Sequence, residues 1–264
     1  MSPVRRLSHP IITSRRDLAR ILRHAARSLR GQPVTRLTAL RAAAALLRGA
    51  GRRDLFRALL SRMPPWHTHA RYEVPGKADG YRGRDPRRSA RELALLAGVW
   101  PGTEGEGVLD MPCGAGRLSA FLAARGHRGF GADRARAMLA AAPYRARACA
   151  DAARLPFADR AVDGVVVFRF LHHLDRHDAR AVVGEAARVA ARWVVVSTFH
   201  PASAHAVWRR VRALAARRAP TRFAHAPARI TRWFAAHGFT PAGCAREGAL
   251  RELCVLSFRR GAAS

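Results

Sequence analysis

Three aspartates in the middle of this chain each follow a short apolar stretch, at the position where a strand would end. They are Asp110, Asp133 and Asp151. The first of them runs into a glycine-rich turn at 114–116, after which a helical pattern begins. A sharp backbone turn favours glycine because a ligand can then approach without meeting a Cβ atom. Carboxylates at strand ends hydrogen-bond ribose hydroxyls in nucleotide-binding α/β folds, so the pattern indicates a nucleotide-like ligand beside a helix N-terminus.

Histidines follow the next two apolar stretches along the chain. His172 and His173 come after residues 162–168, and His200 comes after residues 193–198. A histidine can remove a proton near neutral pH, which is useful when a nucleophile arrives protonated. These three histidines are therefore the candidate catalytic residues. A histidine in such a turn can also cap a helix or pack against a sheet, and the sequence leaves both interpretations open.

The elements that must position these side chains alternate between apolar runs and helical patterns from residue 108 onward. This alternation is typical of an α/β fold with a mostly parallel sheet. Strands are predicted at 108–111, 128–132, 146–150, 162–168, 193–198, 240–246 and 252–259. Helices are predicted at 87–99, 117–125, 202–217 and 227–237, with others between the strands.

Four segments, in this order, resemble motifs of the class I S-adenosylmethionine (SAM)-dependent methyltransferases, of the subfamily that includes quinone and small-molecule methyltransferases. VLDMPCGAGR at 108–117 resembles the cofactor loop, and GFGAD at 129–133 resembles the acidic position after the second strand. DAARLPF at 151–157 resembles the element whose aspartate contacts the adenine amino group. FRFLHHL at 168–174 resembles the segment after the fourth strand, and the resemblance as a whole covers residues 85–260.

The resemblance implies SAM as the cofactor and a Rossmann-like, doubly wound, seven-stranded α/β sheet, mostly parallel with the last strand antiparallel. The residues that it implies for cofactor binding are Asp110, Pro112, Cys113, Gly114, Gly116, Asp133, Arg134, Asp151, Ala152, Phe168 and Arg84. Pro112 departs from the family, which usually has glycine there, because proline removes a backbone donor and fixes φ. The turn can still form, since residues 113–115 keep their amides. A dehydrogenase is a weaker interpretation, because Ser119 stands where G-x-G-x-x-G needs glycine.

The methyl acceptor is predicted to be a small molecule, a quinone or a lipid-linked compound. The fourth predicted strand is followed by Arg169-Phe170-Leu171, not by the Asn/Asp-Pro-Pro-Tyr run of methyltransferases that act on adenine or glutamine amino groups. It is also not followed by Pro-Cys, so cytosine-C5 chemistry through a thiolate is not expected. Arg169 is a candidate for holding an anionic substrate group. One alternative is an RNA methyltransferase that uses the basic N-terminal region to bind phosphates. The other is a non-catalytic assembly partner with this fold, and the three aspartates argue against this second alternative.

The charge balance is strongly basic, with 48 lysine and arginine residues against 18 acidic ones and a formal net charge of +30. Such a surface attracts polyanions, for example RNA or an anionic membrane. Residues 1–65 are predicted to form a basic helical extension, with an amphipathic helix at 15–30. This extension either caps the main domain or binds lipid or nucleic acid. Residues 66–86 are predicted to be a linker or a substrate-covering loop, and residues 87–264 the methyltransferase domain.

The chain has four cysteines, widely spaced in the sequence and without a C-x-x-C pair. A metal site and a disulfide framework are therefore not expected, and reduced thiols are the better interpretation. No apolar run reaches the length of a membrane-spanning helix, and no signal-peptide pattern stands near the start. We expect a cytoplasmic enzyme, with peripheral association at a membrane surface if the acceptor is lipid-linked.

Overall fold

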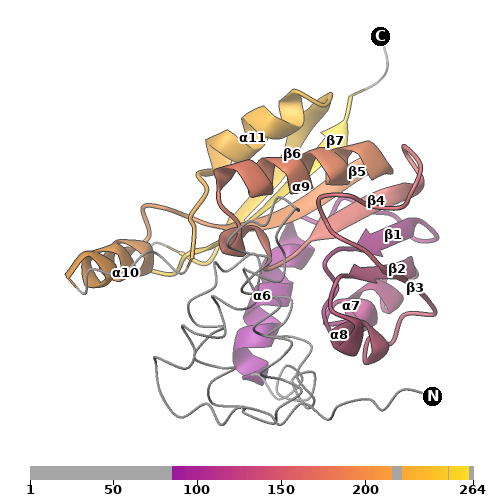
Figure 1. The fold of residues 1–264 in the computed structure, drawn as a ribbon, viewed down its shortest axis with the longest axis horizontal. Coiled ribbons are helices and arrows are strands. Elements are labelled where there is room, and N and C mark those ends of the chain that lie inside the picture. Colours follow the sequence, from indigo (N-terminus) through magenta and orange to yellow (C-terminus); the bar gives the residue numbers. More distant parts are fainter. Residues whose placement is uncertain (1–84, 216–221, 249, 262–264) are drawn as a thin grey trace, which may run out of the picture. The chain divides into compact units, whose positions relative to one another are not determined.

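The computed structural model describes residues 85–215, 222–248 and 250–261 (Figure 1). These residues all belong to one unit of the chain, Pro65–Ser264. The predicted helical extension at 1–65, nearly all of the predicted loop at 66–86, and Arg84 with it, lie outside the described residues. The domain boundaries therefore stay predictions.

A seven-stranded sheet forms the centre of the described unit, with the strand order β3-β2-β1-β4-β5-β7-β6. The strands are β1 (Gly107–Asp110), β2 (Arg128–Asp133), β3 (Ala146–Cys149), β4 (Val162–Val167), β5 (Ala190–Phe199), β6 (Phe239–Arg246) and β7 (Leu253–Arg260). Strands β1 to β5 pair in parallel, and β7 is antiparallel to both of its neighbours. This arrangement confirms the predicted fold class. The strand order reverses between β1 and β4, which is where such sheets bind ligands at their carboxyl edge.

The helices precede β1 or lie between later strands, and two of them begin at an aspartate cap. They are α6 (Pro86–Gly98), α7 (Ser119–Ala123), α8 (Arg136–Ala140), the short 3₁₀ helix η2 (Leu171–His173), α9 (Arg176–Val189), α10 (Ala204–Ala215) and α11 (Pro227–Ala235). The carboxylates of Asp85 and Asp175 accept backbone N–H groups at the starts of α6 and α9. Strand β5 begins three residues earlier than predicted, because Ala190 pairs with Val162 of β4 directly after α9 ends.

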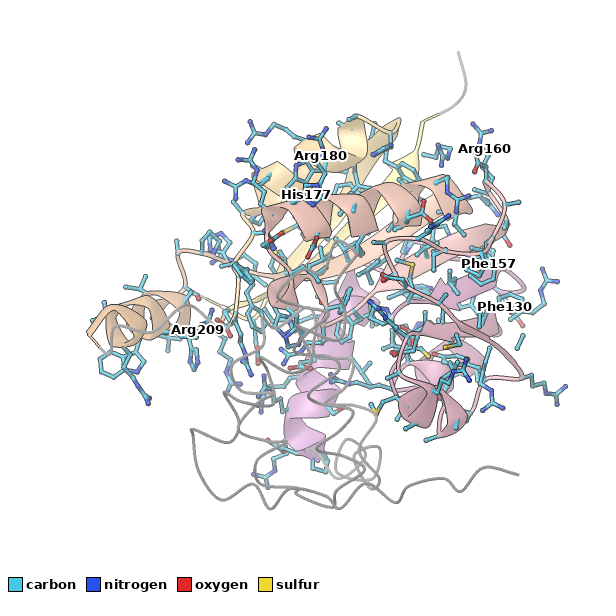
Figure 2. The ribbon with its side chains drawn as sticks, in the orientation of Figure 1. Phe130, Phe157, Arg160, His177, Arg180 and Arg209 are labelled. Carbon is cyan, nitrogen blue, oxygen red and sulfur yellow. The ribbon has the colours of Figure 1, made fainter. Side chains whose placement is uncertain are left out.

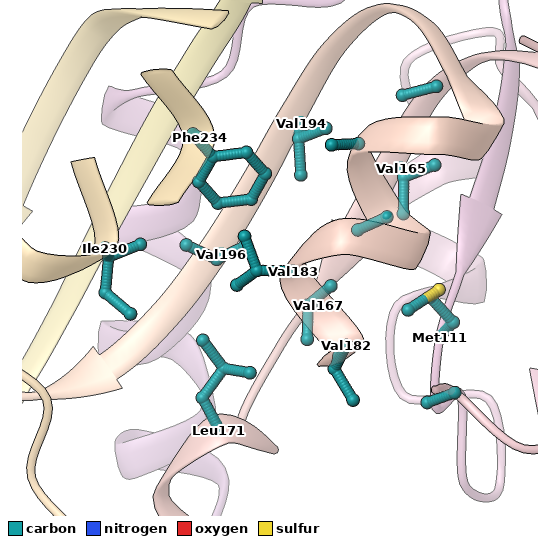
Figure 3. Close-up of a cluster of buried hydrophobic side chains, with 14 of the residues drawn as sticks. Met111, Val165, Val167, Leu171, Val182, Val183, Val194, Val196, Ile230 and Phe234 are labelled. Carbon is teal, nitrogen blue, oxygen red and sulfur yellow. The ribbon is translucent and has the colours of Figure 1, made fainter. Parts of the chain in front are cut away.

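Two hydrophobic layers cover the two faces of the sheet, and the alternation of side chains along β4 and β5 supplies both. Val165, Val167, Val194 and Val196 face α9 and α11, which lie side by side in Figure 1. Figure 3 shows this layer, where Phe234 and Ile230 of α11 approach the same valines. The intervening residues of both strands face the other layer, which includes side chains of α6, α7 and α8. Because both faces are covered, ligands can reach β4 and β5 only at their ends.

Trp193 fixes the contact between β4 and β5 near the amino ends of these strands. Its side chain is fully buried, and its Nε1 donates a hydrogen bond to Glu106 at 2.7 Å. The ring occupies the space where a Cβ on Gly164 would lie, so the neighbouring strand requires glycine at this position. The two strands are thereby held in one register, which sets where each of them ends.

Two of the four cysteines come together although they are ten positions apart in the sequence. Cys244 on β6 and Cys254 on β7 have their Sγ atoms 3.8 Å apart, as free thiols. The pairing of β6 with β7 brings them together, which the spacing in the sequence did not indicate. None of the helices among the described residues is long and apolar enough to span a bilayer.

Candidate functional site

The glycine-rich turn after β1 has the backbone conformation for which glycine was expected. Gly114 has φ of +55° and Gly116 has φ of +78°, both in the left-handed region that favours glycine. A Cβ on Gly116 would also lie 3.1 Å from the Cα of Ala142. The turn therefore packs against the segment after α8 and leaves no room for a side chain there. Helix α7 begins at Ser119, later than predicted, because the turn continues to that residue.

Asp133, the last residue of β2, ties this turn to the sheet. Its Oδ2 accepts the N–H of Gly114 at 2.7 Å, and its Oδ1 accepts the N–H of Ala135 at 2.8 Å. The N–H of Cys113 is also used inside the protein, because it donates to the carbonyl of Ala132 at 2.8 Å. The backbone N–H groups of Cys113 and Gly114 therefore donate within the protein, where they hold the turn in its conformation. Asp133 thus acts from the end of β2 as an acceptor for the backbone of the loop that follows β1.

Asp110 lies deeper than the other two aspartates. It is 2% exposed, and its Oδ2 accepts the hydroxyl of Tyr144 at 2.7 Å. Burial raises the pKa of this carboxyl to about 7, against the opposing effect of the Tyr144 hydrogen bond. The carboxyl thus has little surface to offer a ligand. Sequence reasoning missed Tyr144, which stands in no motif and reaches Asp110 only through the fold.

Asp151 lies at the surface beyond the end of β3. Its side chain is 48% exposed, and its two oxygens accept Arg134 Nη1 and the N–H of Ala153, each at 3.0 Å. Ala152 and Phe168 are buried, in the two different hydrophobic layers, and Pro112 is half-buried. Among the predicted cofactor residues, the structure therefore gives exposed carboxylate oxygen chiefly to Asp151.

Arg169 makes an unusual turn directly after β4. Its φ is +59°, which is a strained value for a residue with a Cβ. The N–H of Arg169 donates to Oγ of the buried Ser197 on β5 at 2.6 Å, and this bond holds the turn in place. The guanidinium is directed into the protein, where its Nη1 lies 3.2 Å from a carboxylate oxygen of Glu92.

Glu92 on α6 is the centre of a buried ion cluster. It is 2% exposed and also pairs with Arg88 at 3.0 Å and Arg117 at 2.7 Å. Burial by itself would raise the pKa of Glu92, but the charges of Arg169 and Arg117 outweigh it and hold the pKa below its ordinary value. Sequence reasoning missed Glu92. The available signal was that it is the only acidic residue of α6 and stands four residues before the buried Leu96, on the same helix face.

His172 and His173 lie together in η2, as predicted, but in different surroundings. His172 is 2% exposed and stacks on the ring of Phe199, with 4.0 Å between the centroids. Burial, together with the charges of His173 and Arg169, holds the pKa of His172 well below its ordinary value, so this ring is neutral at pH 7. His173 is half-buried, with its ring 4.0 Å from that of His172. The outer ring of the pair is therefore the better placed to meet an acceptor.

His200 is half-buried at the end of β5, and burial lowers its pKa. Its Nδ1 accepts the N–H of Ala202 at 3.2 Å. In the neutral ring the proton then lies on Nε2, because one nitrogen of a neutral imidazole accepts while the other donates. In this geometry His200 presents a hydrogen-bond donor on its other nitrogen, which suits it less well to the role of a base.

The segment at 222–226 holds η2 in position. Phe223 donates its N–H to the carbonyl of His172 at 2.8 Å. Nε2 of the buried His225 lies 3.2 Å from the carbonyl of Leu171 and 3.1 Å from that of Leu174, so it must carry the proton that both carbonyls accept. No pattern in the sequence indicated this contact, which joins residues far apart in the chain.

Within the described ranges, no group of three or more histidine, cysteine or carboxylate side chains is arranged to hold a metal ion. The carboxyl edge instead has two parts. The ends of β1, β2 and β3 carry Asp110, Asp133 and Asp151, and the ends of β4 and β5 carry arginine and histidine side chains. Such an edge can bind a ligand with hydroxyl and amino donors on one side and place a second molecule beside it.

Comparison with known proteins agrees with this arrangement. Residues 108–192 match the family model of a methyltransferase domain. No curated protein sequence matches the chain. Magnesium protoporphyrin IX methyltransferase of Synechocystis PCC 6803, solved with S-adenosylhomocysteine (SAH), is similar with a TM-score of 0.55 and 21% identity, over 66% of this chain and 83% of that one.

Two further solved structures are similar over most of their own length. The N-methyltransferase NodS of Bradyrhizobium japonicum WM9, also with SAH, has a TM-score of 0.54 and 18% identity, over 75% of this chain and 99% of that one. A Haloferax volcanii protein solved with the methyltransferase activator Trm112 has a TM-score of 0.55 and 18% identity, over 71% and 96%. Likeness at these identities establishes the fold. The family match adds that residues 108–192 are similar to a methyltransferase domain.

Proposed function

We propose that the protein transfers the methyl group of SAM to a small-molecule, quinone or lipid-linked acceptor bound at the carboxyl ends of β4 and β5. The observation that carries this proposal is the division of the sheet edge at the point where the strand order reverses. Carboxylates stand on one side of it, and arginine and histidine side chains stand on the other. Two different partners of one reaction therefore have chemically different places to bind.

The residues at the ends of β1 to β3 fit SAM. The turn at 114–116 has no side chain larger than a methyl group, so the backbone can be approached closely. Asp133 stands at the end of β2, where a carboxylate is suited to accept the two ribose hydroxyls. Asp151, exposed beside Ala152, is suited to accept the adenine amino group. Asp110 supports the turn from inside the protein through its bond to Tyr144.

When bound, SAM supplies a methyl group that its sulfonium has already made electrophilic. The chain's own task is to align the acceptor and to exclude competing water. Where the acceptor's nucleophile carries a proton, His173 is the residue that we propose to receive it. His172 stacks on Phe199 and contacts the ring of His173 at a tilt, so it supports the outer ring. His200, with its proton on Nε2, is suited to donate a hydrogen bond to the acceptor instead.

The segment after β4 supports a small acceptor. It contains no Asn/Asp-Pro-Pro-Tyr run, and Arg169 occupies a strained turn that the Ser197 hydroxyl stabilises. The segment at 222–226 is bonded across η2 through Phe223 and His225, so it borders the acceptor side. Intramolecular contacts of this kind favour a bounded site over a long open surface.

Radiolabelled methyl transfer into a cell extract tests the proposal. The full chain is incubated with labelled SAM and extract, and the label is sorted into RNA, protein, lipid and small-molecule fractions. We expect label in the small-molecule or lipid fraction. Label confined to RNA would replace our proposal with an RNA methyltransferase. SAM binding without transfer to any fraction would favour a non-catalytic role.

A further inference from the structure

Two thiols meet across the strands β6 and β7 at one edge of the sheet. Cys244 stands opposite Leu256 in the antiparallel pairing, and Cys254 is two positions from Leu256 on the same strand. Residues opposite each other, and residues two apart on one strand, point to the same face of a sheet. The two Sγ atoms are 3.8 Å apart, and both belong to free thiols. The fold therefore places two oxidisable groups side by side, where the proposed methyl transfer does not use them.

Solvent reaches the two thiols unequally. Cys244 is exposed, whereas Cys254 is 0% exposed and lies among the apolar side chains of the core. A groove of about 340 Å³ is lined by Cys244 and, from α11, by Pro227 and Thr231. Burial raises the pKa of Cys254 to about 12, so this thiol is protonated at neutral pH. A small oxidant in the groove therefore meets Cys244 first, with Cys254 in contact behind it.

The other two cysteines have different surroundings. Cys149 is exposed, and its Sγ lies 3.7 Å from the carbonyl of Arg134. Cys113 is 4% exposed, its Sγ lies 3.5 Å from the carbonyl of Gly114, and burial raises its pKa. Cys149 and Cys244 lie on β3 and β6, the two edge strands of the sheet (Figure 2). The chain thus carries its own comparison between an exposed thiol beside a second thiol and an exposed thiol beside a carbonyl.

We propose that Cys244 and Cys254 are a modification site, at which a hydroperoxide oxidises the pair to a disulfide that a dithiol can reduce again. The thiolate of Cys244 attacks one oxygen of the hydroperoxide, the O–O bond breaks, and the sulfur becomes a sulfenic acid while an alcohol leaves. The sulfur of Cys254 then gives up its proton and attacks the sulfur of Cys244, so the S–O bond breaks and water leaves. Overall, two thiols and one hydroperoxide give one disulfide, one alcohol and one water.

The bridge would join the edge strand to the strand that borders the acceptor side. The sulfur atoms have to approach to about 2.05 Å, which rotation of the exposed Cys244 side chain allows. Cys254 pairs with Thr198 of β5, and the carbonyl of Glu252 on the same side of the hairpin accepts the N–H of His200 at 2.7 Å. The oxidised pair would therefore fix β6 to the chain segment that holds His200.

Peptide mapping after mild oxidation tests this proposal. The full chain is reduced, freed of reductant and exposed to hydrogen peroxide, and its remaining thiols are alkylated before digestion with trypsin without reductant. Cleavage after Arg246 and Arg251 puts the two cysteines on separate peptides, so the disulfide joins peptide 233–246 to peptide 252–259. We expect this linked pair from chains that migrate as monomers, and we expect a dithiol to release it. Cys149, on a third peptide, should stay outside the link.

Cys254→Ala is the informative variant, because it keeps the exposed thiol and removes the one that we propose to resolve it. Dimedone, which reacts with sulfenic acids, should then label Cys244 more heavily than in the wild type, and the linked pair of peptides should be lost. Cys149→Ala is the matched control, since it also removes one thiol but leaves the pair intact. It should give the linked peptides as the wild type does.

Two results with the wild type would overturn the proposal, whether or not the variants fold. Cys244 oxidised to a sulfinic acid while Cys254 stays alkylated would show that the second thiol does not reach the first. Cys244 unmodified at peroxide concentrations that oxidise Cys149 would show that the groove does not open this thiol to an oxidant. None of these measurements involves methyl transfer, so their outcome is independent of the function proposed above.

Discussion

The two halves of the sheet's carboxyl edge differ in charge and in how their side chains are held. At the ends of β1 and β2, carboxylates are held by neutral donors, such as the Gly114 amide on Asp133 and the Tyr144 hydroxyl on Asp110. At the ends of β4 and β5, arginines surround buried carboxylates and aromatic rings. An adenosine presents hydroxyl and amino donors that suit the first half. The second half suits a molecule that presents acceptors.

Two buried carboxyls summarise the difference. Asp110 and Glu92 are each 2% exposed. Burial raises the pKa of Asp110 to about 7, since only a neutral hydroxyl and a more distant charge oppose it. The pKa of Glu92 lies below its ordinary value, since the arginine charges outweigh its burial. The same residue chemistry at the same depth therefore has opposite protonation behaviour, and the neighbouring side chains decide which.

Glu92→Gln should cause the largest effect, because it leaves three arginines without their shared carboxylate. We expect the free energy of unfolding at pH 7 to fall by about 3 to 5 kcal/mol, measured by denaturant titration. Glu247→Gln is the control, since Glu247 pairs with Arg91 and Arg251 at a more exposed position and should change stability by less than about 1 kcal/mol. Equal losses in the two variants would show that the cluster is no more than a surface ion pair.

Asp133→Ala should weaken SAM binding by about 100-fold, or about 2.7 kcal/mol, without a comparable loss of stability. The carboxylate both fixes the Gly114 amide and is proposed to bind the ribose, so the substitution removes both contributions. Calorimetric titration measures the affinity. Asp159→Ala, which removes a carboxylate that is 77% exposed, should leave it unchanged. SAM affinity unchanged in Asp133→Ala would remove this residue from the cofactor site.

Asp110→Asn should change the pH dependence of stability. The folded pKa of about 7 lies above the ordinary value of 3.8, so the folded protein binds this proton more tightly than the unfolded chain does. Its stabilising contribution is complete below about pH 4 and is lost as the pH rises towards 7. Asparagine can still accept the Tyr144 hydroxyl but does not titrate. Between about pH 4 and pH 7, we therefore expect the free energy of unfolding of the variant to fall about 2 kcal/mol less than that of the wild type. Parallel curves for the two proteins would contradict the raised pKa.

His173→Gln should have the smallest of these effects, slowing methyl transfer by about tenfold while SAM affinity stays unchanged. His200→Gln should slow it less, because the Ala202 N–H occupies Nδ1 and the proton lies on Nε2. Single-turnover transfer rates compare the two. A greater loss in His200→Gln would reverse the roles that we assign to these residues.

The sequence predicted the seven strands and their order along the chain, because long apolar runs and turn residues specify strands locally. It also placed Asp133 and Asp151 at strand ends, and the histidines of η2 in a turn. The contacts that define the charge of each half could not be predicted from the sequence. Glu92 meets Arg169, and Tyr144 meets Asp110, only after distant segments fold together. Pairing of side chains across such distances leaves no periodic pattern in the sequence.

A crystal structure of the full chain with SAH tests the central claim most directly. We expect the ribose hydroxyls to bind the carboxylate of Asp133, the adenine to lie beside Asp151 and Ala152, and the sulfur to point towards η2. Arg169, which follows β4, should then stay outside the cofactor's contacts. SAH bound with its ribose away from Asp133, or with its carboxylate at Arg169, would contradict the division of the edge into a cofactor half and an acceptor half.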